Sequence, residues 1–392
     1  MTTSLSLVDE YVFRLLESDA SSQASKLLAA RAIKQMSSVA STRGLLVLQG
    51  ALKCCLTLST SSSSSPSTSD PSSVLVRRYL SHALAKMLVT TNSTLLPSHQ
   101  RLDAIRPLLA LCREDSNSSL EHFEALLALT NLTSCGASEQ STLIHHKGLK
   151  IVFFLMLHEH PGVRRAAVEL ICNLSSASET VDFFTTREHL KVLVNFCCQW
   201  SSPDLSVVDD EGDEKEEPRV VELPIPPPSS SSSSSPLTTE AYKAARASSG
   251  ALASLTCSSP SSAKLCSVFI MQEKGLESMV TLLASSKYEL IHRALVVLEN
   301  IIAACGAELT KKERKLLAEE DNMDEMDVFG RGILGEHWIP GAKSVTRLLE
   351  AAIQTSINAL KSMKGRDEKM VDLFGEMSSA LLKSITKLRT EK

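Results

Sequence analysis

The sequence predicts an all-α protein whose helices stack into an elongated solenoid, and three observations point to this fold class. Hydrophobic residues make up 43% of the 392 residues, whereas aromatic residues make up only 4% and there are 15 glycines. Sandwiches, barrels and propellers need β-forming residues and turns at short intervals, so this composition disfavours them. Leu and Ala, which favour helix, recur throughout the chain. Similar apolar segments also return at a nearly constant spacing, which is the third observation.

The returning segments are long apolar helices that share one pattern. They lie at Glu121–Cys135, Val163–Ala177, Ala244–Ser258 and Leu290–Ala304. Aligning Asn131, Asn173, Ser254 and Asn300 gives steps of 42, 81 and 46 residues. The 81-residue step contains a polar insertion of about 28 residues, and it falls to the low fifties when that insertion is discounted. Units near 42 residues are typical of armadillo and HEAT arrays. We therefore expect a right-handed superhelical solenoid of about five units.

A shorter apolar helix is expected before each long one. The candidates are Gly44–Cys55, Ile105–Cys112, Gly148–Leu157, His189–Cys198 and Gly275–Leu283. Glycine suits a tight turn between helices, and an apolar spacing of three and four buries one face of each helix. A single unit cannot bury its apolar face alone, so stacked units are expected to form a superhelix with a concave groove.

Two polar segments interrupt the helical pattern. Ser59–Ser73 has no apolar residue and two prolines, and Asp209–Pro236 combines an acidic run, prolines and seven serines. Such segments have nothing to bury, so disordered Ser/Pro-rich insertions are expected at residues 59–73 and 205–238. Both fall inside a predicted armadillo-like domain at residues 41–310. An N-terminal helical cap is expected at 1–40, and a linker with capping helices at 311–392.

Candidate groove residues follow from the spacing within each long helix. The third helix of an armadillo unit lines the concave side, and residues four apart share a face. The candidates for binding a client protein are Asn131, Asn173, Asn300, Phe123, Leu127, Arg165, Glu169, Arg246, Ser254 and His292. Burying an Asn side chain costs free energy unless the side chain is hydrogen-bonded. Three asparagines at the same position of their repeats are therefore expected to share one hydrogen-bonding role. Either they bond the backbone of an extended partner segment, or each one ties its own repeat together through a neighbouring turn.

Cationic residues open several of the long helices. Arg78, Arg165 and Arg246 occupy the same position relative to the aligned residues of their units. They are able to give the groove a basic edge that suits an acidic partner segment. Basic residues at the start of a helix are also common on solvated faces, so this alternative stays open.

The remaining composition excludes several classes of protein. The N-terminus lacks the pattern of a secretory signal, and the longest apolar run, about Ile151–Leu157, is far shorter than the roughly 20 residues of a spanning helix. Ten cysteines without a CxxC motif are expected to be reduced core thiols of a cytoplasmic protein. The net charge of −4 gives no reason to expect nucleic acid, and no membrane partner is expected.

Motifs of enzyme or metal chemistry are not present in the sequence. It contains neither GxxxxGK[ST] nor GxSxG, and its GxGxxG string at Gly330–Gly335 falls in an expected glycine-rich loop, so neither enzymatic activity nor a cofactor is expected. The histidine clusters at 145–146 and 158–160 lack HExxH spacing, so they are not expected to hold a metal. His158 and His160 are instead expected to cap the turn at Pro161–Gly162.

A set of strings resembles the UCS family of myosin-directed chaperones. They are IRPLL at Ile105–Leu109, FEALLALTNL at Phe123–Leu132, KGLKIV at Lys147–Val152, RRAAVELICNL at Arg164–Leu174, SGALASLT at Ser249–Thr256 and IHRALVVLENI at Ile291–Ile301. Their order and spacing match that family over about residues 40–310. The string at Phe123–Leu132 is the specific one, because generic armadillo proteins share only its ALxNL kernel.

The resemblance implies an armadillo-like domain that binds the myosin motor domain and assists its folding or assembly through the concave groove. It also makes heat-shock protein 90 a second candidate partner. Animal members of the family recruit that chaperone through N-terminal tetratricopeptide repeats, and residues 1–41 are too short for three such repeats.

A general armadillo scaffold or peptide-binding adaptor with another client is the alternative function. Nuclear-transport receptors of this class place Trp four residues before the ladder Asn. Here those places hold Leu127, Glu169 and Val296, which disfavours the adaptor.

Overall fold

The computed structural model describes most of the predicted array. The described residues are 12–18, 21–60, 71–114, 116–199, 236–258, 266, 275–283, 285, 287–304, 353–354, 372, 375–381 and 383. Within these ranges the regular structure is helical throughout, with no strand. No helix in the same ranges combines the length and apolar content needed to cross a membrane.

Residues 12–17 and 375–381 are helical, and between them fifteen helical elements have defined bounds. They are α2 (Gln23–Ser38), α3 (Ala40–Leu48), α4 (Ala51–Thr60), α5 (Pro71–Thr90), η1 (Ser93–Leu95), α6 (Ser98–Arg113), α7 (Ser119–Thr133), α8 (Ala137–His145), α9 (Gly148–Leu155), α10 (Pro161–Leu174), α11 (Ser178–Phe184), α12 (Arg187–Gln199), α13 (Pro236–Thr256), α15 (Gly275–Leu283) and α16 (Tyr288–Ala304).

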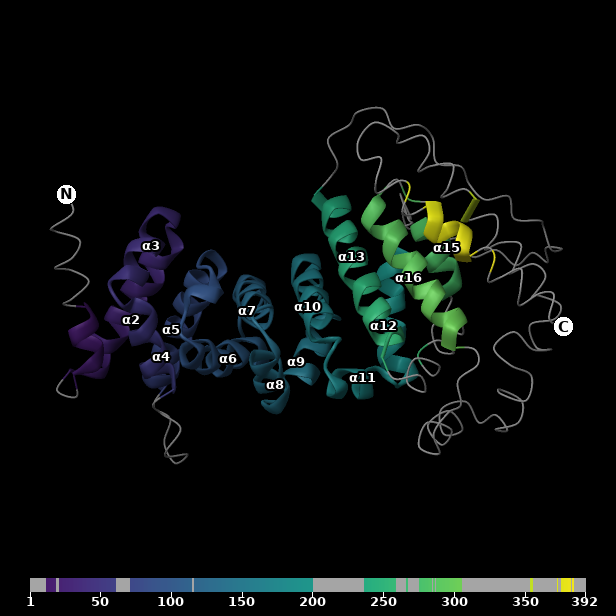
Figure 1. The fold of residues 1–392 in the computed structure, drawn as a ribbon. Helices are drawn as coiled ribbons and strands as arrows, with labels where there is room; N and C mark the ends of the chain where they lie inside the picture. Colours follow the sequence, from purple (N-terminus) through teal and green to yellow (C-terminus); the bar gives the residue numbers. More distant parts are fainter. Residues whose placement is uncertain are drawn as a thin grey trace, which may run out of the picture.

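The helices form a row of stacked units, seen side by side in Figure 1. The long helices α2, α5, α7, α10, α13 and α16, here called the ladder helices, each contact the next one along the row. A second set of contacts joins α4 to α6, α6 to α9, and α12 to α15. Units such as α8–α9–α10 thus pair a ladder helix with two shorter helices. The predicted all-α solenoid is confirmed.

The core of the row consists mainly of Leu and Ala on the ladder helices. Ala125, Leu126 and Leu129 of α7 and Ala166 and Leu170 of α10 are fully buried. Alternating small and large side chains let neighbouring helices approach closely while still removing apolar surface from water. The low aromatic content is therefore consistent with helix-on-helix packing along the whole row.

Most of the described cysteines belong to this core, as the sequence predicts. Cys54, Cys55, Cys112, Cys197 and Cys266 are buried, and none of the described cysteines forms a disulfide. Burial raises the pKa of the Cys112 thiol to about 12, so this sulfur stays protonated and behaves as a small hydrophobic group. Cys257 differs, because it is exposed.

The predicted helix at residues 44–55 is wrong in one respect. A turn at Gln49 and Gly50 divides it into α3 and α4. Gly50 has φ +90°, a left-handed conformation that glycine adopts without the strain a side chain would bring. The apolar pattern runs through this turn, so its periodicity alone did not reveal the break.

The boundaries of the two predicted insertions also change. Helix α4 continues to Thr60 and α5 begins at Pro71, so residues 59–60 and 71–73 are helical rather than loop. Pro71 suits the first turn of a helix, because its missing N–H has no partner there anyway. Likewise, α13 begins at Pro236. The rest of both insertions, and most of 311–392, lie outside the described residues.

A glycine permits the close approach of α8 and α9. A Cβ atom on Gly148 would lie 2.4 Å from Leu143 Cδ2 and 2.7 Å from the Leu143 carbonyl oxygen. The carbonyl is main chain and cannot move aside cheaply. By contrast, a Cβ atom on Gly44, inside α3, would meet no atom within 4 Å.

We therefore predict opposite effects for two alanine substitutions. Gly148→Ala should lower the free energy of unfolding by about 1–3 kcal/mol, because the added methyl group overpacks the α8–α9 turn. Gly44→Ala should leave it unchanged or raise it by about 0.5–1 kcal/mol, because alanine favours the helix. Urea unfolding followed by circular dichroism measures both changes. Equal losses in the two variants would contradict this steric explanation.

Candidate functional site

The three ladder asparagines all point their amide nitrogen at the preceding ladder helix. Asn131 Nδ2 donates to the carbonyl oxygens of Leu88 (3.2 Å) and Val89 (3.3 Å). These acceptors lie in the last turn of α5, where carbonyls have no partner in their own helix. Asn131 therefore closes the end of α5 from the next unit along the row.

Asn173 and Asn300 repeat this arrangement with a second acceptor. Asn173 Nδ2 lies 3.0 Å from the Thr130 carbonyl oxygen and 3.4 Å from Thr133 Oγ1. Asn300 Nδ2 lies 3.1 Å from both the Ala253 carbonyl oxygen and Thr256 Oγ1. Each Asn thus binds a carbonyl and a threonine hydroxyl three residues later. The tie between neighbouring repeats, one of the two explanations for these residues, is present in the structure.

The asparagines nevertheless keep part of their surface open. All three are half-buried rather than buried. The bonds to the preceding helix use Nδ2, and no bond to Oδ1 is formed within the described residues. An amide oxygen has two lone pairs, so each of these side chains can still accept a hydrogen bond. Ser254, the aligned residue of α13, is also half-buried.

The cations that open the ladder helices are paired within the chain. Arg78 Nη2 lies 2.6 Å from Glu121 Oε2, and Arg246 Nη1 lies 3.1 Å from Glu289 Oε2. Each pair joins an arginine inside one ladder helix to a glutamate in the first turn of the next. Their charges are therefore neutralised locally, and the predicted basic edge is wrong at these positions.

Arg165 is paired in the same way and joins two ladder helices. Its Nε lies 2.5 Å from Glu240 Oε2 of α13, and its Nη1 lies 3.0 Å from Glu169. The guanidinium carbon also stands 5.2 Å from the centre of the Phe123 ring, within the range of a cation–π contact. The structure thus brings Phe123, Arg165 and Glu169 together between α7 and α10.

The other candidates are more dispersed. Leu127 is half-buried and packs against the core from α7. His292 is half-buried on α16, and burial together with the nearby Arg293 lowers its pKa. Arg293 donates a hydrogen bond to the Arg246 carbonyl oxygen. His292 and Arg246 therefore lie by the same pair of ladder helices, α13 and α16, two ladder helices beyond the Phe123 contact between α7 and α10.

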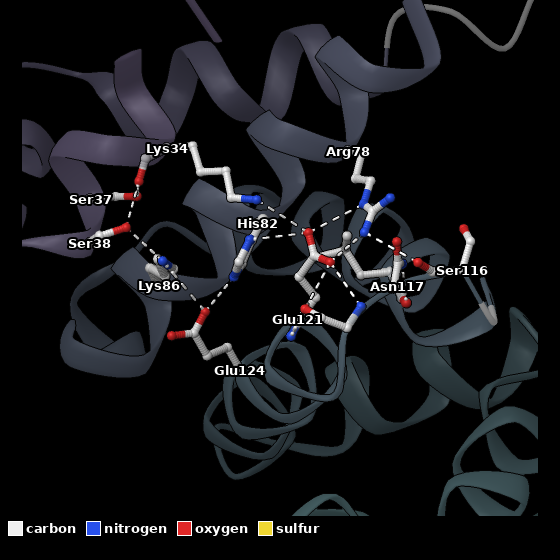
Figure 2. Close-up of polar contacts among 12 residues, drawn as sticks. Lys34, Ser37, Ser38, Arg78, His82, Lys86, Ser116, Asn117, Glu121 and Glu124 are labelled. Carbon is white, nitrogen blue, oxygen red and sulfur yellow. Dashed lines mark hydrogen bonds and ion pairs between the residues drawn. The ribbon is translucent and has the colours of Figure 1, made fainter. Parts of the chain in front are cut away.

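A buried polar cluster between α2, α5 and α7 was not foreseen from the sequence (Figure 2). Glu121 is 3% exposed, and its carboxylate contacts Arg78, His82 Nδ1 at 3.3 Å and Lys34 Nζ at 3.4 Å. It also accepts a hydrogen bond from the Ser118 backbone N–H at 3.0 Å, which completes a capping box at the start of α7. One carboxylate thus holds three helices and a helix terminus.

His82 links this carboxylate to a second one. Its Nε2 lies 2.5 Å from Glu124 Oε2, while its side chain is 3% exposed. Lys86 completes the cluster by donating to Ser38 Oγ at 2.7 Å. Burial lowers the pKa of Lys86, and the nearby Glu124 opposes this shift. Sequence spacing gave no sign of the cluster, because Glu121 stands between apolar positions and its partners come from two other helices.

The pKa of Glu121 reports the balance of forces in the cluster. Burial alone would raise it, but hydrogen bonds from His82, Arg78 and the Ser118 backbone outweigh burial and hold the pKa of this carboxyl well below its usual range. A depressed folded-state pKa means that the ionised form stabilises the fold. That contribution is complete above the unfolded value near 4.5 and is lost as the pH falls below it.

His160 caps α10, as the sequence predicts. Its Nδ1 accepts a hydrogen bond from the Gly162 backbone N–H at 3.2 Å, directly before Pro161 opens the helix. Within the described residues, no three His, Cys, Asp or Glu side chains come together as a metal ion would need.

We predict that Glu121→Gln destabilises the protein in a pH-dependent manner. At pH 7 the change should cost about 3 kcal/mol, because it leaves the half-buried Arg78 without its carboxylate and removes one of the two carboxylate partners of the buried His82. As the pH falls below about 4.5, the difference in the free energy of unfolding between the variant and the wild type should shrink. The reason is that protonation of Glu121 removes the charge that stabilises the wild-type fold. Urea unfolding between pH 3 and 7 measures the difference.

The matched control is Asp103→Asn, which removes an exposed carboxyl on α6. It should change the free energy of unfolding by less than about 0.5 kcal/mol at every pH. A Glu121→Gln variant that behaves like this control would contradict a stabilising role for the cluster.

Comparison with known proteins finds relatives among the UNC-45 proteins. No family model matches the chain. In sequence it is similar to the protein unc-45 homolog B of Xenopus laevis, with 26% identity over 293 residues, or 74% of this chain and 25% of that protein. The homologue of Danio rerio is 29% identical over 248 residues, or 62% of this chain and 21% of that protein. The chain therefore spans about a quarter of the length of the curated relatives it matches.

Solved structures show the same likeness in fold. UNC-45 from Drosophila melanogaster matches with a TM-score of 0.64 and 22% identity, covering 99% of this chain and 38% of that one. The crystal structure of She4p matches with a TM-score of 0.57 and 19% identity, covering 96% and 43%. Likeness in sequence and likeness in fold thus agree, and they confirm the resemblance to the UCS family: the chain is an armadillo-repeat relative of the UNC-45 proteins.

Proposed function

We propose that this protein is a myosin-binding chaperone that assists folding and assembly of the myosin motor domain. The observation that carries the proposal is its similarity to unc-45 homolog B over 293 residues, because the UCS family it resembles is directed to myosin. The solenoid fold supports it, since a row of stacked units offers an extended surface to a client.

In this proposal the ladder helices bind client segments without turnover of a nucleotide. Oδ1 of Asn131, Asn173 and Asn300 accepts hydrogen bonds from client backbone N–H groups, and Phe123 and Leu127 contact apolar side chains. The remaining candidates, Arg165, Glu169, Arg246, Ser254 and His292, border the same row. Buried reduced thiols fit the cytoplasm as the site of action, and heat-shock protein 90 is proposed as a second partner.

A general peptide-binding adaptor is the competing function, and the ladder argues against it. Leu127 and Val296 are half-buried aliphatic residues, and Glu169 is engaged by Arg165. None of these three positions offers the aromatic face on which such a receptor clamps a peptide. Tight binding of a basic nuclear-localisation peptide would favour the adaptor instead.

We predict that the protein suppresses aggregation of heated myosin motor fragments. Light scattering at a fixed temperature, with and without equimolar protein, measures the effect. A heated globular protein unrelated to myosin serves as the control, because a specific chaperone should protect it much less. Equal protection of both clients, or no protection of myosin together with no myosin in a pull-down, would contradict the proposal.

We further predict that the double change Asn131→Ala and Asn173→Ala weakens binding of the motor domain by about tenfold or more, because two hydrogen bonds to the client are lost. The same change should lower the free energy of unfolding by about 1–3 kcal/mol at Asn131, whose acceptors on Leu88 and Val89 lose their donor. The loss at Asn173 should be about 1 kcal/mol, because the Thr130 carbonyl keeps the Ser134 backbone N–H. Binding is measured by fluorescence anisotropy well below the melting temperature.

Thr133→Val separates the two roles. Thr133 is fully buried and accepts from Asn173 Nδ2, so this variant weakens the tie between repeats without touching the exposed surface. It should lose stability but keep its affinity for the motor domain. If it loses as much affinity as the double Asn variant, the asparagines act on binding only through the fold.

A further inference from the structure

A hollow of about 210 Å³ lies between α4, α5 and α6. None of the candidate client residues lines it. Its apolar walls come from Val74, Pro107, Ala110 and Leu111, and its polar lining consists of Ser59, Arg77, Arg78, Ser81, Arg106 and Glu114. Sites for drug-sized ligands measure about 300–1,000 Å³. The hollow is therefore suited to one small group rather than to a whole large ligand.

The three arginines reach the hollow from two helices. Arg77 and Arg78 are neighbours on α5, and Arg106 is an exposed residue of α6. Arg78 uses Nε and Nη2 to bind Glu121, which leaves Nη1 outside that pair. Arg106 forms no hydrogen bond or ion pair with any part of the chain that the structure describes. A buried hydroxyl, that of Ser81, also lines the hollow.

Arg106 lies near His146 and affects the pKa of that side chain. The pKa of His146 is lowered, first by burial and then by the positive charges of His145, Arg106 and Arg113. Three arginines line the hollow, whereas Glu114 is the one carboxylate among its lining residues.

We propose that this hollow binds a phosphate group, held by Arg77, Arg78 and Arg106. Guanidinium groups bind phosphate through paired, charge-assisted hydrogen bonds. A phosphate monoester offers three terminal oxygens, one toward each arginine, whereas a carboxylate offers only two. The same chemistry is carried by a free phosphorylated small molecule and by a phosphoserine side chain. This site does not depend on the proposed role in myosin folding.

The test is a calorimetric titration of the full chain at low ionic strength. The probes are inorganic phosphate, a short phosphoserine peptide and the same peptide without phosphate. Saturable binding of a phosphate probe is expected, and Arg106→Ala should weaken it about tenfold, because it removes a charge-assisted contact. Arg113→Ala removes another exposed arginine of α6 that does not line the hollow, and it should change the affinity by less than about twofold.

A third variant tests the sign of the charge effect. Glu114→Gln removes the carboxylate that repels an anion, so it should tighten phosphate binding several-fold while leaving all three arginines in place. Tighter binding of the phosphopeptide than of inorganic phosphate would identify a phosphoprotein as the source, and equal affinities would identify a small molecule. Absence of saturable binding by every phosphate probe, or equal losses in Arg106→Ala and Arg113→Ala, would overturn the proposal.

Discussion

The structure depends on asparagines that reach from three of the ladder helices to the end of the helix before. The last carbonyls of an α-helix cannot be satisfied within that helix, and a carbonyl left buried without a partner costs about 1–3 kcal/mol. Asn131 donates from the next unit to the Leu88 and Val89 carbonyls at the end of α5. Asn173 and Asn300 add a second donor to carbonyls that already accept from the Ser134 and Cys257 backbone N–H groups. The same contact thus ties α7 to α5, α10 to α7 and α16 to α13, as expected for a solenoid stabilised by nearest-neighbour interfaces.

Charged residues also connect neighbouring ladder helices. Arg78–Glu121 and Arg246–Glu289 each join an arginine inside one ladder helix to a glutamate in the first turn of the next. The two pairs differ in how much they contribute to the stability of the fold. Arg246–Glu289 is exposed, so it contributes little, at most about 1 kcal/mol. Glu121 is buried among several donors, and losing it would strand their charges. The N-terminal part of the row is therefore held by a polar cluster as well as by apolar packing.

Much of this architecture was predictable from the sequence, because it follows from local pattern. The period near 42 residues and the aligned asparagines indicated the ladder helices, and Pro161 with His160 indicated a helix start. The break at Gly50 was missed, since it depends on a backbone conformation rather than on periodicity. The pairing of the ladder arginines was missed for another reason. Their partners Glu121, Glu240 and Glu289 lie on different helices, 43 to 75 residues away in the sequence. A single sequence does not reveal which residues so far apart are in contact.

These contacts also decide what the ladder can offer to a client. Arg78, Arg165 and Arg246 are already paired with carboxylates, so an acidic segment lying along the candidate client residues would gain little Coulomb attraction from these three side chains. The amide nitrogens are committed to helix carbonyls, which makes the amide oxygens the remaining acceptors. An amide group is planar, so fixing Nδ2 also fixes the direction of Oδ1 and lowers the entropy lost when a client N–H binds there. The structural and binding roles of these asparagines are therefore compatible, because the bond that completes the repeat also orients the acceptor.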